Sequence, residues 1–408
     1  DTPETDALNK IDDPRYATLP FPPAPMRVQA KYEVAGKEGA IEADVNVAYK
    51  GEAGEPLERA VAVAPAYSVM MNPGQQVIAT GTKTARPVTV TVSSNLPQPS
   101  KGLLRLDVPQ GWHAEPAELP TELPARGTTR TFSFNVTPQD TQEGKAEVKA
   151  ALAAGGTTFS EGYSVVTRDD LNTFYYYQPA IQRVSVVDVK VPQGLRVGYV
   201  MGAGDEIPSV LEQIGMTVTV LGAEKLKTED LSKYDTIVLG IRAYDTQKDL
   251  APNNARLLDW VKGGGTLVVQ YDTSVGDFNA GKFTPYPATL GRGRVSVEEA
   301  PVKILAPTNP VFHSPNEISE RDFDGWIQER GLYFMSQWDT KFTPLLETHD
   351  PGEPDQKGGM LEAEYGKGLY IYTGYAFFRE LPAGVPGAVR LYVNMLSAKG
   401  SGQLAAGR

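Results

Sequence analysis

The sequence predicts a multidomain β and α/β protein, in which an immunoglobulin-like β-sandwich precedes a flavodoxin-like α/β domain with a parallel sheet. Short alternating segments separated by Pro and Gly turns fill residues 67–167, which is typical of a sandwich. From residue 195 the period changes, and short apolar strands alternate with amphipathic helices. That order is typical of a parallel sheet with helices on both faces. A chain of 408 residues is also too long for one ordinary core.

The first 66 residues divide into two predicted segments. Residues 1–26 are rich in proline and lack a period, so we expect an extended connector. Residues 27–66 contain alternating stretches on either side of a turn at Gly36. They predict the strands of a partial β-domain.

The predicted immunoglobulin-like sandwich covers residues 67–167. Its clearest strands are residues 87–92, 102–108, 131–136 and 146–152. Trp112 stands at a strand end, where packing in the core is favoured over stacking on a carbohydrate. Residues 168–194 form an aromatic-rich linker and strand, and residues 174–177 are four consecutive aromatics. An inter-domain seam that buries alternate rings is favoured there over a binding surface.

The flavodoxin-like domain is predicted over residues 195–400. Its parallel strands are expected at residues 195–200, 217–221, 234–240, 266–271 and 368–374, and its helices at 207–214, 253–262 and 387–396. Residues 275–345 lack a clear period and predict an irregular insertion. Residues 401–408 predict a flexible tail.

Composition excludes several classes of function. The net charge of −11 argues against a nucleic-acid partner or an anionic membrane surface. There is no cysteine, so disulfides, thiolate metal sites and cysteine nucleophiles are impossible. No stretch approaches the length of a membrane span. The chain opens with a polar, acidic segment rather than a signal peptide, so we expect that export processing or truncation removed a preceding segment.

Ligands of open parallel sheets bind at the carboxyl ends of the strands. The candidate ligand-binding residues are therefore those that follow the predicted strands, together with a tryptophan of the insertion: Asp205, Glu206, Arg242, Tyr244, Gln270, Tyr271, Trp326, Tyr375 and Arg379.

Catalytic and cofactor motifs are weak in this region. Residues 202–204 read Gly-Ala-Gly but lack the third glycine of a dinucleotide fingerprint, and two carboxylates follow where a pyrophosphate would lie. Ser274 is the one plausible nucleophile, yet it lacks flanking glycines, and His313 and His349 lie in distant loops. No cluster has the spacing of metal ligands. We therefore predict no catalytic residue, no metal site and no cofactor in this chain.

Several segments resemble the C-terminal region of large bacterial PIG-L (LmbE-like) deacetylases. They are residues 197–208, 239–244, 253–259, 322–326, 344–347 and 381–388. The resemblance implies that the later domain is similar to class I glutamine-amidotransferase-like folds. It also implies that N-acetyl-sugar deacetylation resides in a separate zinc domain marked by an Ala-His-Pro-Asp-Asp-Glu-type motif. That motif is absent here, because Asp169-Asp170 lacks the preceding His-Pro and Asp12-Asp13 is followed by proline. Zinc is therefore expected only in the missing domain.

The leading hypothesis is an accessory region of an exported (periplasmic or extracellular) deacetylase. Its expected partners are a carbohydrate or cell-wall glycan and the deacetylase domain of the same polypeptide. One alternative is a hydrolase with an unfamiliar site at the strand ends, whose carboxylates would need raised pKa values or close pairing. A second alternative is a purely structural or oligomerisation module.

Overall fold

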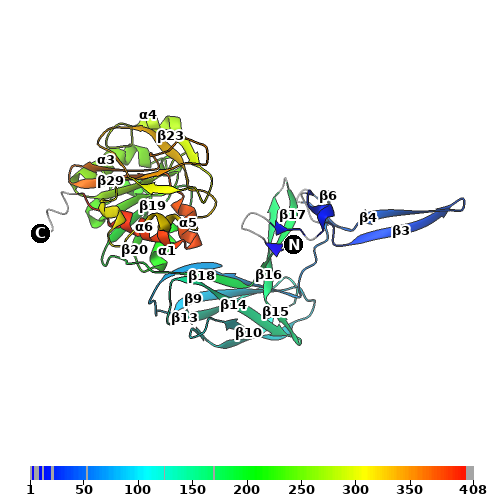
Figure 1. Cartoon of the computed structure of the whole chain (residues 1–408). Coiled ribbons are helices and arrows are strands. Elements are labelled where there is room, and N and C mark those ends of the chain that lie inside the picture. The colour runs from blue at the N-terminus through cyan, green and yellow to red at the C-terminus, as the bar shows by residue number, and fades with distance from the viewer. Residues whose placement is uncertain are drawn as a thin grey trace.

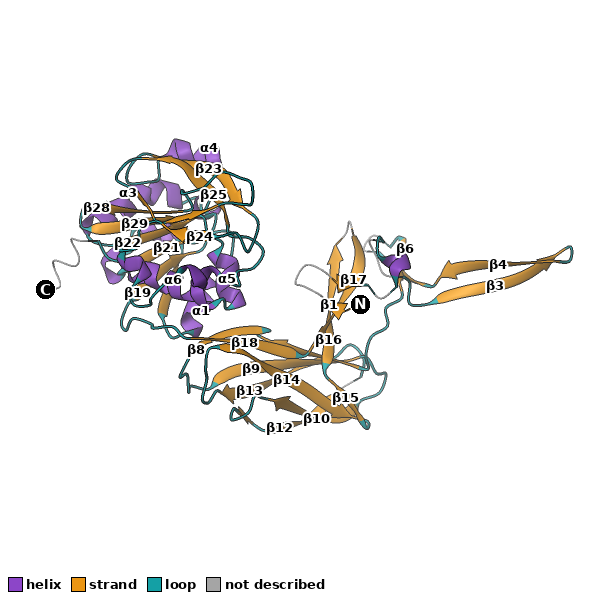
Figure 2. Cartoon of the chain, in the orientation of Figure 1, coloured by secondary structure: helices purple, strands orange, loops and turns teal. Residues whose placement is uncertain are grey.

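The computed structural model describes residues 2–3, 9–11, 13–19, 23–51, 54–123, 125–168 and 171–400 (Figure 1). The predicted tail at 401–408 and much of the predicted connector at 1–26 lie outside the described residues. The described chain runs from N-terminal hairpins through a β-sandwich to a C-terminal region of mixed helices and strands (Figure 2).

The N-terminal part consists of small two-stranded units. Strands β1 (Thr2–Pro3) and β2 (Asn9–Lys10) pair with each other, and a 3₁₀ turn follows at Pro14–Tyr16. Two antiparallel hairpins come next: β3 (Arg27–Val34) with β4 (Lys37–Asp44), and β5 (Asn46–Lys50) with β6 (Pro56–Ala60). Within the described residues neither hairpin joins a larger sheet, so the strands predicted for residues 27–66 are present but do not share a core.

Two sheets form the predicted β-sandwich. One sheet has the order β12 (Glu118–Leu123), β10 (Ser100–Asp107), β14 (Gly144–Ala154), β18 (Ile181–Val187) and β8 (Gln75–Ala79), with β15 (Thr157–Phe159) also on β14. The other has the order β11 (His113–Glu115), β13 (Thr129–Thr137), β9 (Arg86–Ser94) and β7 (Tyr67–Asn72). Their facing residues alternate with exposed ones and form a single buried cluster. Trp112 belongs to this cluster, as predicted.

Strand β18 lies beyond the residues predicted for the sandwich. It pairs antiparallel with β14 and parallel with β8, so it is an interior strand of the larger sheet. The sequence placed it in a linker because an alternating strand does not reveal which sheet it joins.

The four consecutive aromatics lie in a hairpin of β16 (Glu161–Arg168) and β17 (Leu171–Pro179). Tyr175 and Tyr177 lie with their ring centroids 5.5 and 5.9 Å from that of Tyr163 on the facing strand. Phe174 and Tyr176, on alternate positions, are exposed. Tyr177 is also exposed although its ring lies near Tyr163, so of the four rings only that of Tyr175 is half-buried.

The C-terminal region (residues 195–400) is built on one seven-stranded sheet. Its strand order is β20 (Thr217–Leu221), β19 (Arg196–Val200), β21 (Thr236–Leu239), β22 (Thr266–Gln270), β29 (Gly368–Thr373), β28 (Met360–Tyr365) and β26 (Thr343–Pro344). The first five strands are mutually parallel, and β28 and β26 add in antiparallel fashion. All five predicted parallel strands are present, with ends no more than two residues from those predicted.

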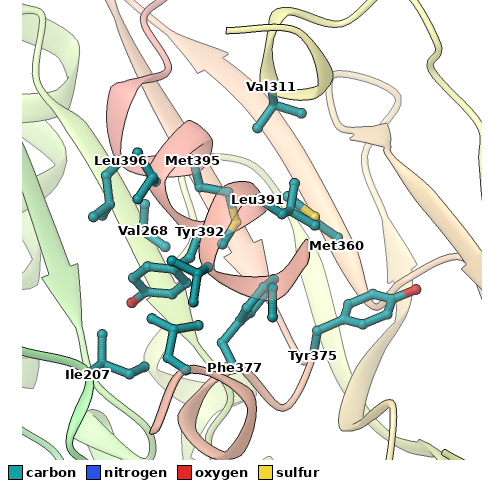
Figure 3. Close-up of a cluster of buried hydrophobic side chains, with 14 of the residues drawn as sticks. Ile207, Val268, Val311, Met360, Tyr375, Phe377, Leu391, Tyr392, Met395 and Leu396 are labelled. Carbon is teal, nitrogen blue, oxygen red and sulfur yellow. The ribbon is translucent and has the colours of Figure 1, made fainter. Parts of the chain in front are cut away.

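Helices cover both faces of this sheet. On one face α1 (Ile207–Gln213), α5 (Phe377–Ala383) and α6 (Pro386–Ser397) share a buried apolar cluster with the strands (Figure 3). On the other face α3 (Leu250–Gly263) packs on the strands, preceded by the short α2 (Ala243–Thr246). Helix α6 is buried on nearly every side, because it lies between the sheet and the loops of the insertion.

The insertion predicted to be irregular contains regular structure. Helix α4 (Val275–Gly281) leads into β23 (Ala288–Val295), which pairs with β25 (Gly331–Trp338), and β24 (Val302–Ile304) pairs with β27 (Leu346–Thr348). The prediction of an irregular segment is therefore wrong here. Register shifts interrupt the β23–β25 ladder at Leu290 and Gly293, so the alternation that marks a strand is broken.

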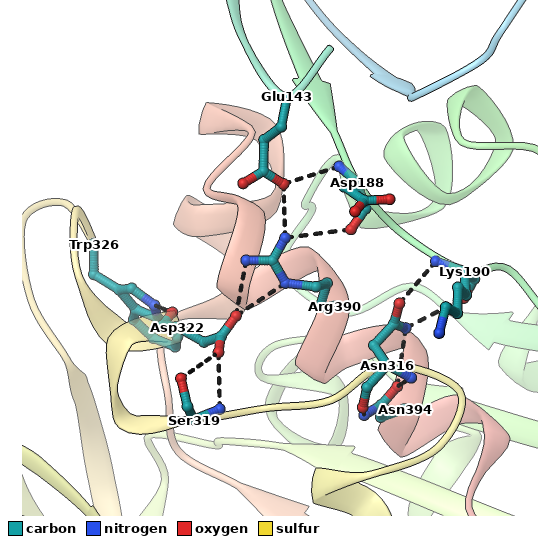
Figure 4. Close-up of polar contacts among 9 residues, drawn as sticks. All are labelled: Glu143, Asp188, Lys190, Asn316, Ser319, Asp322, Trp326, Arg390 and Asn394. Carbon is teal, nitrogen blue, oxygen red and sulfur yellow. Dashed lines mark hydrogen bonds and ion pairs between the residues drawn. The ribbon is translucent and has the colours of Figure 1, made fainter.

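Polar contacts join the sandwich to the C-terminal region (Figure 4). The Arg390 guanidinium lies 2.7 Å from the Glu143 carboxylate and 2.8 Å from that of Asp322. Asn316 accepts a hydrogen bond from the Lys190 amide at 2.7 Å and donates to the Lys190 carbonyl at 3.2 Å. The segment that follows β18 is thus held by side chains of both parts.

Candidate functional site

The loops that follow the parallel strands touch one another at their first residues. The Ala203 amide donates to the Ile241 carbonyl oxygen at 2.8 Å. A Cβ atom at Gly202 would lie 1.9 Å from that same oxygen, so only glycine allows this close approach. The ends of β19 and β21 are therefore in direct contact.

Asp205 and Gln270 belong to a buried network around Tyr199. The Tyr199 hydroxyl lies 2.9 Å from both oxygens of Asp205, and the Gln270 amide nitrogen donates to that hydroxyl at 2.9 Å. Asp205 also accepts from the Ile207 amide at 3.1 Å, which holds the start of α1. Burial raises the pKa of Asp205, although these hydrogen bonds oppose the rise. Glu206, in contrast, is exposed and makes no side-chain cap on α1.

The carboxylates of Asp245 and Asp272 connect the loops after β21 and β22 through hydrogen bonds. Asp272 accepts from the backbone amides of Tyr244 at 2.9 Å and Asp245 at 3.3 Å. Asp245 in return accepts from the Thr273 amide and hydroxyl at 2.8 and 2.7 Å, and from the Ser274 amide at 3.1 Å. Each carboxylate therefore binds the backbone of the other's loop.

The two carboxylates differ in protonation. Burial, followed by repulsion from Asp245, raises the pKa of Asp272 to about 8. Burial would also raise the pKa of Asp245, but the hydrogen bonds from Thr273 and Ser274 outweigh it and lower the pKa below its usual value. Both residues follow parallel strands, as the strand-end rule expects, but neither is in the predicted ligand set; only the fold shows that they face one another.

Arg242 follows the central strand β21 in a left-handed backbone conformation, with φ 57° and ψ 31°. Its amide donates to the Tyr271 carbonyl at 2.7 Å, and its Nε lies 3.3 Å from Asp245 Oδ2. A non-glycine residue in this region costs about 1–3 kcal/mol, and such residues gather at functional sites. The end of the central strand thus carries a strained arginine rather than a nucleophile.

Tyr271, whose carbonyl accepts from the Arg242 amide, is buried against two half-buried rings. The Tyr271 ring stacks on Tyr333 at a centroid distance of 5.8 Å and lies 5.7 Å from Phe378. The Arg379 guanidinium lies 4.8 Å from the Phe378 centroid. We call Arg242, Tyr271, Tyr333, Phe378 and Arg379 the strand-end patch.

The charges of the patch act on the Tyr271 hydroxyl. Burial and then the Glu329 carboxylate raise the pKa of Tyr271 to about 12, while Arg379 and Arg242 oppose the rise. Glu329 also lies 3.2 Å from Arg379 and 3.0 Å from Arg294. The patch therefore combines aromatic rings with guanidinium groups held in place by carboxylates.

Three further predicted ligand residues, besides Asp205, Glu206 and Gln270, are not part of the patch. Tyr244 stacks on Phe283 at a centroid distance of 4.1 Å and donates its hydroxyl to Asn254 at 2.6 Å. Trp326 and Tyr375 are almost completely buried and pack on each other. A ligand would reach these two rings only by displacing the core, so the structure places them in packing.

No catalytic pair forms around Ser274. His313 bonds to Glu317 and to the Pro307 carbonyl, and His349 lies 3.1 Å from Asp355. His113 lies on β11 of the sandwich.

The residues described here also contain no group of three or more His, Asp or Glu side chains arranged to hold a metal ion. Asp12, Asp169 and Asp170 lie outside the described residues. The donor sets that are present do not fit the zinc ion that the resemblance implies for the deacetylase.

One cleft was not indicated by the sequence. It has a volume of about 690 Å³ and lies between the α4–β23 loop and the end of β25. Tyr286, Trp338, Asn279 and Gln337 line it. Its volume is within the usual range for small-molecule sites, so it competes with the strand-end patch as a binding surface.

Comparisons with known proteins concern the sandwich. The Calx CBD1 domain is 12% identical, with a TM-score of 0.20, over 31% of this chain and 100% of that one. The CARDB domain of the PF1109 protein from Pyrococcus furiosus is 18% identical, with a TM-score of 0.19, over 31% and 96%. A complex of zinc 2-glycoprotein and prolactin inducible protein from human seminal plasma matches at 12% identity and a TM-score of 0.20, over 30% and 96%.

No protein-family model and no curated protein matches the sequence. Among the described residues, no helix has the length and apolar character needed to cross a membrane.

Proposed function

We propose that this chain is the accessory, glycan-binding region of an exported deacetylase of the PIG-L type, and that its C-terminal region is a flavodoxin-like domain. The proposal rests on Arg242, because a strained arginine occupies the strand end where a hydrolase of this layout would carry its nucleophile. The strand order supports the fold: the second strand in the chain lies at the edge, followed by the first, third, fourth and fifth.

The chemistry of the strand-end patch suits a sugar. The half-buried rings of Tyr333 and Phe378, which pack on the buried Tyr271, offer apolar surface to the C–H face of a sugar ring. The guanidinium groups of Arg242 and Arg379 offer donors in a fixed plane to hydroxyl, carbonyl or carboxylate oxygens. Both arginines are paired with carboxylates, so recognition would depend on hydrogen bonds rather than on net positive charge.

The hydrolase alternative receives less support from the same contacts. It needs an accessible acid and base within reach of one substrate. Asp205 and Gln270 are bound into the Tyr199 network, and Tyr375 lies in the core. We therefore propose binding and not turnover.

Isothermal titration with N-acetylated oligosaccharides and sedimentation with insoluble peptidoglycan test the proposal. We expect Arg379→Ala and Arg242→Gln to weaken binding about tenfold or more, since each removes a charged hydrogen-bond donor. Arg292→Gln, at an exposed arginine, is the matched control and should bind like the parent chain. Loss of binding in Trp338→Ala alone would move the site to the cleft, and absence of binding by the parent chain would refute the proposal.

A further inference from the structure

The β3–β4 hairpin has one largely apolar side, interrupted by Lys37 beside the turn, that nothing covers in the described chain. Strands β3 and β4 extend away from the sandwich (Figure 1). Because directly paired residues of an antiparallel ladder point to the same side, the register assigns side chains to faces. The apolar face holds Val28, Ala30, Tyr32, Val34, Ile41 and Ala43.

The opposite face of the hairpin is polar. Arg27 lies 3.1 Å from Asp44, and Gln29 donates to Glu42 at 2.8 Å. On the apolar face, Val34 and Ile41 are 66% and 63% exposed. An isolated two-stranded hairpin is marginal in water, and an exposed apolar face of this kind marks an interaction surface.

The backbone of β3 shows which groups remain free along its outer edge. The Val45 amide donates to the Met26 carbonyl at 3.0 Å, which extends the ladder by one bonded pair. Bonded pairs recur at every second residue, so the even-numbered residues of β3 bond to β4. The N–H and C=O groups of Arg27, Gln29, Lys31 and Glu33 therefore point toward the free edge.

We propose that this edge pairs antiparallel with the same edge of a second copy of the chain. With Ala30 opposite Ala30 of the second copy, Arg27 lies opposite Glu33, and Gln29 opposite Lys31. This register uses the free backbone groups of nearly the whole strand and forms two Arg–Glu pairs. A shift by one bonded pair in either direction places Lys31 opposite itself or Arg27 opposite Lys31 of the second copy. Charge therefore favours the proposed register over its two neighbours.

The pairing also extends the apolar face. Val28 comes to lie opposite Tyr32 of the second copy, as a non-hydrogen-bonded pair with closely spaced side chains. The result is a four-stranded sheet with one continuous apolar side, which exceeds the minimum for an independently stable sheet.

The outer edge of β4 is unsuited to the same contact. Its free positions carry Glu38, Glu42 and Asp44. In the registers that overlap most of β4, Glu38 lies opposite Glu42 or Asp44 of the second copy, which is repulsive. Edge acids of this kind stop further strand addition, so we expect a closed two-fold dimer.

Site-specific crosslinking tests this register, because the chain has no cysteine of its own. In Ala30→Cys the two sulfurs face each other on the dimer axis, at a Cα separation of about 4.5 Å that a disulfide accepts. We expect mild oxidation to give a covalent dimer of the full chain. Ala43→Cys, on the same face but on β4, is the matched control and should remain monomeric. A monomeric Ala30→Cys, or equal crosslinking of both variants, would overturn the proposal.

Charge reversal supplies an independent test in solution. Glu33→Lys places a lysine opposite Arg27 of the second copy and should weaken dimerisation about tenfold or more. Within its own hairpin the new lysine faces Glu38, so the hairpin is not weakened. Arg27 also pairs with Asp44 within its own hairpin, so the restoring variant is R27E/E33K/D44N, in which the change at position 44 avoids repulsion of the new carboxylate; it should restore the dimer in sedimentation equilibrium. A parent chain that stays monomeric up to roughly 0.1 mM, or that grows into open-ended assemblies, contradicts the closed dimer.

Discussion

The hydrogen bonds of Asn394 lead to a prediction about the stability of the C-terminal region. This residue of α6 is fully buried, and its amide nitrogen donates to the Val311 and Asn316 carbonyls at 2.8 and 2.7 Å (Figure 4). Its carbonyl oxygen accepts from the Asn316 backbone amide and side chain, both at 3.0 Å. Asn316 in turn bonds to Lys190, so this one amide stabilises both the insertion and the connection to the sandwich.

Replacement of Asn394 by alanine removes four hydrogen bonds and leaves buried backbone groups without partners. Each unsatisfied group costs about 1–3 kcal/mol. Because three of the four bonds involve Asn316, their contributions do not add fully. We expect the free energy of unfolding of the C-terminal region to fall by about 3–5 kcal/mol.

Urea unfolding followed by tryptophan fluorescence measures this loss. Trp260, Trp326 and Trp338 lie in the C-terminal region and Trp112 in the sandwich, so the signal reports mainly on the affected part. The midpoint of its transition should fall by about 2 M, given typical denaturant slopes. Asn253→Ala, which removes one bond on the surface of α3, is the control and should shift the midpoint little. An unchanged midpoint in Asn394→Ala would refute the reasoning.

Three further outcomes follow from the strand ends. The pKa of Asp272 is about 8 in the folded chain and about 4 in the unfolded chain. Because the folded state binds this proton more tightly, protonation of Asp272 adds to the free energy of unfolding. The contribution is fully present below pH 4 and is lost as the pH rises through 8. The free energy of unfolding of the parent chain should therefore fall by about 3–5 kcal/mol between pH 5 and 9, and Asp272→Asn should abolish this fall. Urea titration at each pH measures it, and an identical pH dependence in both chains would contradict the prediction. Gly202→Ala should lower the free energy of unfolding by about 2 kcal/mol or more and weaken glycan binding, because the new methyl group meets the Ile241 carbonyl oxygen. Gly263→Ala is the control and should do neither, because a Cβ atom there has open space. Trp326→Phe should lower the thermal midpoint but leave glycan affinity unchanged, since this ring packs in the core; a loss of affinity at equal folded fraction would return Trp326 to the binding surface.

Local patterns in the sequence were sufficient to predict most of the helices and strands of the C-terminal region. Residues 217–221 were predicted as a strand and form β20 with the same ends. Residues 253–262 and 387–396 were predicted as helices and lie within α3 and α6. The alternation of β9 identified a strand with one buried face. These features depend on side-chain period over a few residues, which the sequence contains directly.

The structure brings only some of the predicted ligand residues together. Arg242, Tyr271 and Arg379 lie together, as expected of residues that follow parallel strands. Tyr333 joins them from the insertion, and no strand-end rule could include it. Trp326 and Tyr375 looked like binding aromatics but are core residues, because burial depends on what packs against a ring and not on its neighbours in the chain.

By itself, the sequence determined the strand and helix periods, the glycine-rich strand ends, the absence of cysteine and the acidic net charge. Only the tertiary structure decided that β18 joins the sandwich, that Asp245 and Asp272 bind each other's loops, and that the apolar side of the β3–β4 hairpin has no cover in the described chain. The physical reason is the range of the interactions. Side-chain period acts within one element, whereas sheet membership, carboxylate pairing and burial depend on residues far apart in the chain that meet only when it folds.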